Sequence, residues 1–170
     1  MIRVLIVERV PFMRNITRFA LECSGHEVIG EAVDGQQALD LFHLYKPDLV
    51  ILALVLQKIQ GIQVLRRIKE TCPDSKIIIC SAIKTQRMID QAMEFGADSY
   101  IIKPFQIYSF ISEVNRVLGL ETTPQELVQK QLLSEREELE QIAAKVLTRT
   151  ISRDELQNFI QKVQGSSHHV

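Results

Sequence analysis

The sequence has no excess of either charge, since 20 Lys and Arg side chains face 21 Asp and Glu side chains for a net charge of −1. That balance gives no electrostatic reason to expect a nucleic-acid partner. No apolar run approaches the roughly 18 residues that a membrane helix needs. The opening segment MIRVLIVERV is apolar but short, is charged at Arg3, Glu8 and Arg9, and lacks a small-residue cleavage site. It therefore indicates a strand and not a signal peptide, and we expect a cytoplasmic protein with no membrane contact.

Cysteine is scarce as well, with three residues at wide spacing: Cys23, Cys72 and Cys80. The odd count and the spacing exclude a disulfide framework and give no pair suited to a metal. We expect reduced thiols that pack as small apolar side chains. The histidines, among them His26 and His43, have no other metal-binding residue at a suitable spacing, and we expect them on the surface. No metal or other cofactor is predicted.

What the sequence does contain is a regular alternation over its first 118 residues. Short apolar runs of strand type occupy 2–7, 27–31, 48–56, 76–80 and 99–102. Each is followed by apolar residues at helical spacing; in the first helix these are Phe12, Ile16, Phe19, Ala20 and Cys23. Five such units predict an α/β fold, a doubly wound five-stranded parallel sheet with helices on both faces.

In sheets of this kind the functional crevice lies at the carboxyl ends of the strands. Five residues end a predicted strand or begin the loop after it: Glu8, Arg9, Ala53, Ser81 and Lys103. We expect their side chains to lie close together.

Several stretches in this order resemble the receiver domains of response regulators, and among them the stand-alone chemotaxis regulators. They are LIVERVPFMR at 5–14, EAVDGQQALDLF at 31–42, KPDLVILALVLQKIQGIQVLRRIK at 46–69, KIIICSA at 76–82 and GADSYIIKPF at 96–105. The resemblance covers about residues 1–118. It implies a flavodoxin-like receiver fold in a two-component pathway.

In that family two adjacent acids bind Mg²⁺, an aspartate ending the third strand accepts phosphate, and a Ser or Thr and a Lys contact the phosphoryl group. Carried over, the resemblance places Ser81 and Lys103 at the last two positions and Tyr100 at the position of the aromatic that responds to the signal. The acid pair, however, reads Glu8-Arg9, and the acceptor position holds Ala53. The sequence therefore predicts a degenerate phosphorylation pocket that belongs to a pseudo-receiver.

Phosphoryl transfer needs an oxygen nucleophile, and Ala53 offers a methyl group among apolar neighbours. Glu8, Arg9 and Lys103 together carry a formal charge of +1, which opposes Mg²⁺ binding. Two arrangements stay open for Arg9. In the first, the Arg9 guanidinium is a fixed cation near the position of the metal, and Glu8 pairs with Lys103 or with Arg9. In the second, the Arg9 side chain extends into solvent. Changes at Glu8-Arg9 and at Gln57 favour natural loss over an engineered Ala53.

Each retained pocket residue also has a structural interpretation. Ser81 can cap the loop before the fourth helix, and Lys103 can neutralise Glu8. Tyr100 is either a packed aromatic at the sheet edge or a surface residue that faces a partner.

The chain is expected to divide into a pseudo-receiver domain at 1–119 and a helical extension at 120–170. A capped, amphipathic pattern predicts one helix at about 124–148, with a narrow apolar stripe of coiled-coil type, and a second at 152–164. This extension carries 6 basic and 8 acidic side chains. It is also too short for a DNA-binding output domain.

We therefore expect a non-enzymatic signalling protein that acts through protein partners. A homodimer is expected, formed through the extension or through the face of the fourth and fifth helices. Two rivals stay open: a receiver phosphorylated on a non-standard acceptor, and a structural dimerisation module.

Overall fold

The computed structural model describes residues 1–120, and the predicted helices at 124–148 and 152–164 lie outside them. Strands and helices alternate strictly along this part of the chain. Their order is β1 (Arg3–Val7), α1 (Pro11–Cys23), β2 (Glu27–Ala32), α2 (Gly35–Tyr45), β3 (Leu49–Leu52), α3 (Gly61–Thr71), β4 (Lys76–Ser81), α4 (Gln86–Glu94), β5 (Ser99–Ile102) and α5 (Ile107–Leu118).

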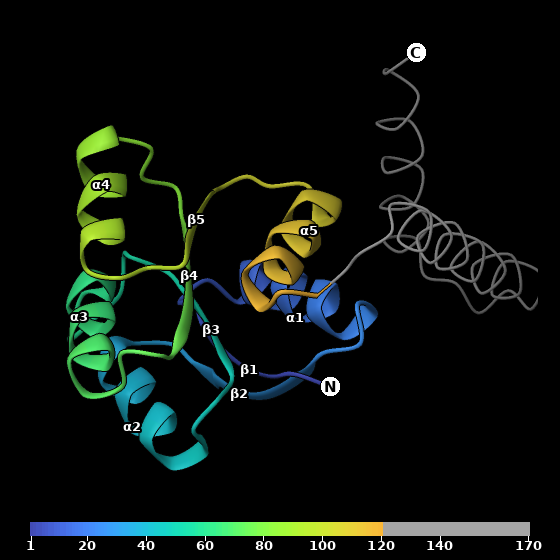
Figure 1. Ribbon diagram of the computed structural model, residues 1–170, viewed down its shortest axis with the longest axis horizontal. Helices are drawn as coiled ribbons and strands as arrows, with labels where there is room; N and C mark the ends of the chain where they lie inside the picture. The colour runs from blue at the N-terminus through green and yellow to red at the C-terminus, as the bar shows by residue number, and fades with distance from the viewer. Residues whose placement is uncertain (121–170) are drawn as a thin grey trace, which may run out of the picture. The chain divides into compact units, whose positions relative to one another are not determined.

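The strands form one parallel sheet in the order β2-β1-β3-β4-β5. Helices α1 and α5 lie side by side on one face, and α2, α3 and α4 cover the other (Figure 1). Strands β1, β3 and β4 are therefore covered on both faces, which explains their nearly continuous apolar runs. The predicted doubly wound α/β fold is confirmed.

Local signals in the sequence set several of the element ends. Pro11 occupies the first turn of α1, where its missing N–H costs nothing. The Asp34 carboxylate caps α2 by accepting a hydrogen bond from the Gln37 N–H at 2.9 Å. Strand β3 ends at Leu52, earlier than the apolar run to residue 56 indicated, because the chain turns away toward α3.

The apolar residues that recur at helical spacing in α1 are only partly buried. Phe12 is 69% exposed and Phe19 is 51% exposed, and Cys23 is exposed too. The residues that α1 buries are Thr17, Ala20 and Leu21, because the helix is rotated about its axis to place Arg14 and Arg18 against β2. The Thr17 hydroxyl is satisfied within the helix by donating to the Met13 carbonyl at 2.9 Å.

Two further expectations about single side chains need correction. Of the three cysteines only Cys80 is buried, while Cys23 and Cys72 lie at the surface. His26, expected on the surface, is buried beneath α5, where its ring lies 3.3 Å from the Asn115 side-chain oxygen. None of the helices within residues 1–120 is both long and apolar enough to cross a membrane.

Candidate functional site

Strand register brings the predicted site residues to one edge of the sheet. Val7 pairs with Leu52, and Leu52 pairs with Ile79, so the residues that follow these strands are neighbours. The Ala53 N–H donates to the Val7 carbonyl at 2.9 Å, and the Lys103 N–H donates to the Ser81 carbonyl at 2.9 Å. All five predicted residues line one cavity of about 350 Å³ there.

Glu8, which follows β1, is a buried acid with 6% of its surface exposed. One carboxylate oxygen, Oε1, accepts a hydrogen bond from the Val10 N–H at 2.7 Å, where α1 is about to begin. The other, Oε2, forms an ion pair with the Lys103 ammonium. Both oxygens are thus engaged by the protein itself, as a buried carboxylate requires.

The ion pair between Glu8 and Lys103 settles one pairing that the sequence left open. Lys103 reaches Glu8 across 95 residues of sequence, from the loop that follows β5. Arg9 takes a different place, because its side chain is exposed and forms no ion pair within residues 1–120. It nevertheless lines the cavity, so it places a solvated cation at the cavity's mouth.

Ala53 directly follows β3, with 6% of its surface exposed. The loop after it folds back tightly, since the Gly61 N–H donates to the Leu54 carbonyl at 2.9 Å. A Cβ on Gly61 would fall 2.0 Å from the Ala53 carbonyl oxygen, so only glycine fits there. Gly61 therefore fixes where the Ala53 methyl group lies in the cavity.

Ser81 is a buried residue whose hydroxyl accepts a hydrogen bond from the Ile83 N–H at 3.2 Å. Tyr100 on β5 packs half-buried against the same loop and donates to the Ile83 carbonyl at 2.6 Å. Burial is the main cause that raises the pKa of Tyr100, so its phenol remains a donor at neutral pH. Of the two interpretations of Tyr100, the structure therefore contains the packed aromatic at the sheet edge.

Cys80 also lines the cavity, next to Ser81. Burial raises the pKa of its thiol to about 12, although the nearby Lys103 charge acts in the opposite direction. A thiol with such a pKa is protonated at neutral pH and is a poor nucleophile. Cys80 is therefore a buried packing residue with a protonated thiol.

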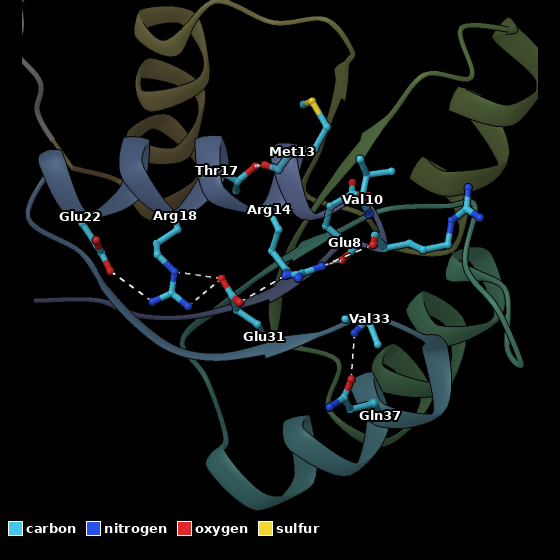
Figure 2. Close-up of polar contacts among 11 residues, drawn as sticks. Glu8, Val10, Met13, Arg14, Thr17, Arg18, Glu22, Glu31, Val33 and Gln37 are labelled. Carbon is cyan, nitrogen blue, oxygen red and sulfur yellow. Dashed lines mark hydrogen bonds and ion pairs between the residues drawn. The ribbon is translucent and has the colours of Figure 1, made fainter. Parts of the chain in front are cut away.

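Sequence reasoning missed Arg14, which lies one turn into α1 and clamps the loop that carries Glu8. Its Nη1 donates to the Glu8 carbonyl at 2.8 Å and to the Arg9 carbonyl at 3.4 Å. Its Nε donates to Glu31 of β2 at 3.2 Å, and Glu31 also pairs with Arg18 at 2.7 Å (Figure 2). The available signal was the spacing of four between the two arginines, which places them on one helix face.

The magnesium site that the family resemblance implies does not fit these residues. Mg²⁺ prefers carboxylate and water oxygens in octahedral geometry. Here the Glu8 oxygens are both occupied, Arg9 is a cation and Ala53 has no oxygen in its side chain. No cluster of three or more His, Cys, Asp or Glu side chains within residues 1–120 could hold a metal ion.

Comparison with known proteins agrees with the fold. The model of the response regulator receiver domain family matches residues 4–115. Protein CcdB of Bacillus subtilis is 40% identical over 119 residues, which cover 70% of this chain and 99% of that protein. The chemotaxis protein CheY of Thermotoga maritima is 36% identical over 115 residues, which cover 68% of this chain and 96% of that protein.

Solved structures give the same result. The CheX-CheY-BeF3-Mg complex from Borrelia burgdorferi contains a chain that matches with a TM-score of 0.68 at 25% identity, over 69% of this chain and 89% of that one. The receiver domain of the response regulator NarL from Mycobacterium tuberculosis matches with a TM-score of 0.66 at 27% identity, over 69% and 97%. By its fold, its strand-end residues and these relatives, the chain belongs to the family of response regulator receiver domains of two-component signalling.

Proposed function

We propose that this chain is a non-enzymatic pseudo-receiver, which takes part in a two-component or phosphorelay pathway without being phosphorylated. Its output would be contact with a protein partner. The state of the domain would then be set by that partner or by assembly.

The observation that carries the proposal is the side chain of Ala53 at the acceptor position. Phosphoryl transfer to a receiver requires an oxygen nucleophile at the end of β3. The methyl group of Ala53 cannot attack phosphorus, and its neighbours Leu54, Val55 and Leu56 are apolar too. Among residues 1–120 the one acid that lines the cavity is Glu8, and both of its carboxylate oxygens are bound to other groups.

Electrostatics supports the same proposal. The charged side chains that line the cavity are Glu8, Arg9 and Lys103, with a formal sum of +1. Enzymes and receivers that transfer a phosphoryl group ordinarily bind a divalent cation, which neutralises the negative charge of that group. Only one of the two adjacent acids remains, as Glu8, and it is paired with Lys103, so the net positive charge of the cavity opposes binding of a divalent cation.

The partner surface that we propose for a second copy of this chain is the face of α4, β5 and α5. Each of these elements carries exposed apolar side chains, namely Met93, Ile102, Ile107 and Tyr108. Residues 120–170 are the other proposed dimer contact, from the amphipathic pattern of their sequence. Sedimentation velocity distinguishes the two proposed dimer contacts when the whole chain is compared with a chain that ends at residue 119. Truncation removes only the contact through residues 120–170, so a dimer that persists forms through the face of α4, β5 and α5.

Intact mass spectrometry after incubation with acetyl phosphate tests the central proposal. We expect no alkali-labile addition of about 80 Da, the mass of a phosphoryl group, on the 170-residue chain. A labile addition on a carboxylate of the cavity would refute the proposal in favour of a non-standard acceptor.

The double variant Arg9→Asp with Ala53→Asp is the matched positive control. It restores a pair of adjacent acids and an acceptor carboxylate, so it is expected to gain the labile phosphoryl group when Mg²⁺ is present. The single variant Arg9→Asp should not gain it, because it still lacks a nucleophile. Gain of phosphate by this single variant would show that the acceptor is a residue other than residue 53.

A further inference from the structure

We propose that the loops at the carboxyl ends of the strands dock an acidic protein segment, through exposed cations that have apolar side chains between them. This inference rests on the proposed function, because it gives the chemistry of the partner through which the chain acts. The partner segment carries Asp or Glu residues interspersed with apolar ones. It contacts the outer surface of the loops, and its binding requires no ligand inside the cavity.

The loops that follow the five strands expose charges of one sign. Their exposed charged side chains are all cations, namely Arg9, Lys58 and Lys84. The two acids in these loops, Glu8 and Asp34, are buried, and each is paired with a lysine. The loops at the opposite edge of the sheet expose charges of both signs, from Lys46, Asp48 and Asp74. The carboxyl edge is therefore the cationic edge of the domain, and it suits an acidic partner.

The helix starts at this edge add to the positive charge. Buried acids engage only the first two, since Glu8 accepts from the Val10 N–H before α1 and Asp34 caps α2. The starts of α3, α4 and α5 have neither a side-chain cap nor an acid in the first turn, and α4 adds the exposed Arg87 there. Their partial positive charges are therefore not neutralised. Arg9, Lys84 and Arg87 form no ion pair within residues 1–120, so their charges are available to a partner.

Apolar side chains among these cations favour a protein partner over a nucleic acid. Val55 in the loop after β3 is 54% exposed, and Val10 and Phe12, which flank the start of α1, are exposed too. Arg9, Val10, Val55 and Ala82 border the same cavity, so the loops after β1, β3 and β4 meet at its opening. Protein interfaces combine an apolar centre with arginine, whereas nucleic-acid surfaces need a larger excess of basic residues than a chain of net charge −1 provides.

Fluorescence anisotropy on the 170-residue chain, with a labelled synthetic peptide as the probe, tests the proposal. The peptide intersperses single Leu and Phe residues among Glu and Asp residues. We expect saturable binding that weakens as NaCl rises from about 50 to about 500 mM, because salt screens exposed charges. The double variant Arg9→Gln with Lys84→Gln should bind about tenfold more weakly at low salt, since two exposed charge contacts are lost. A peptide with serine at its apolar positions should also bind more weakly.

The matched control is the double variant Lys46→Gln with Arg67→Gln. It removes one lysine and one arginine that are exposed and form no ion pair within residues 1–120, from the loop after α2 and from α3. It should bind the peptide as the parent does, while thermal unfolding confirms that each variant is folded. The proposal is overturned if the parent shows no saturable binding, if both double variants lose affinity equally, or if single-stranded DNA of equal charge binds more tightly than the peptide. Each of these results would leave the proposed function standing, because only a covalent phosphoryl adduct refutes that.

Discussion

The ion pair between Glu8 and Lys103 should contribute measurably to the stability of the fold, and a double-mutant cycle can isolate its share. The perturbations are Glu8→Gln, Lys103→Met and the double variant, all in the full-length chain. The Glu8 side chain is 8% exposed and the Lys103 side chain 15%, so the pair lies between a surface bridge and a fully buried one.

The expected magnitude follows from that position. Two unit charges about 4 Å apart interact by about 4 kcal/mol at an effective dielectric of about 20. Solvent in the cavity screens Lys103, and exposed pairs contribute only about 0–1 kcal/mol. We therefore expect a coupling free energy of about 1–3 kcal/mol, between those limits. Lys103→Met should cost more than Glu8→Gln, because it leaves a buried charge while glutamine can still accept from the Val10 N–H.

Urea unfolding of the four proteins at neutral pH measures the coupling, and each kcal/mol should also lower Tm by about 4 °C for a domain of this size. The pair between Lys58 and Asp34, with Lys58 64% exposed, provides the matched control. Lys58→Met should cost no more than about 1 kcal/mol. A coupling below about 0.5 kcal/mol for Glu8 and Lys103 would mean that the pair does not hold the pocket in one state.

Three further outcomes are expected. Gly61→Ala should destabilise the fold by about 2 kcal/mol or more in urea unfolding, because its Cβ would fall 2.0 Å from the Ala53 carbonyl oxygen; a neutral effect would show that the loop yields freely. Although burial alone would raise the pKa of Asp98, the Ile77 N–H and two lysine ammonium groups hold that pKa below the ordinary value of 3.8. The stability that Asp98 contributes is therefore complete above about pH 5 and lost as pH falls through its lowered folded-state pKa, so Asp98→Asn should cost about 2 kcal/mol at pH 7 and flatten the acid side of the stability profile. Iodoacetamide at pH 8 should label two cysteines in the native protein and all three in urea, because the pKa of Cys80 is about 12 and its side chain is buried; rapid native labelling of Cys80 would contradict that environment.

The sequence was sufficient for the architecture, because the relevant signals are local. Apolar runs of four to nine residues, each followed by a helical period, predicted the five β/α units that the structure contains. The cap of α2 at Asp34 is likewise local, because its carboxylate accepts from the N–H three residues further along the chain. Placing the five site residues together needed only the rule that parallel strands share a carboxyl edge.

Side-chain orientation was less predictable, and α1 shows why. Phe12 and Phe19 are apolar at helical spacing, which indicated a buried face, yet both are exposed. The rotation of the helix depends on the contacts of Arg14 and Arg18 with Glu31, which lies on another element. A periodic pattern gives the width of an apolar stripe but carries no information about a partner elsewhere in the chain.

By itself, the sequence determined that an alanine stands at the carboxyl end of the third apolar run's strand, directly after Leu52, and that an arginine follows Glu8, because residue identity and position within a strand–loop unit are local properties. Only the tertiary structure decided that Glu8 pairs with Lys103, that Arg9 extends to the cavity mouth, and that Arg14 grips the carbonyl groups of the same loop. These contacts join residues that are up to 95 positions apart in the sequence. They form because close packing of the folded chain brings such residues together and buries them.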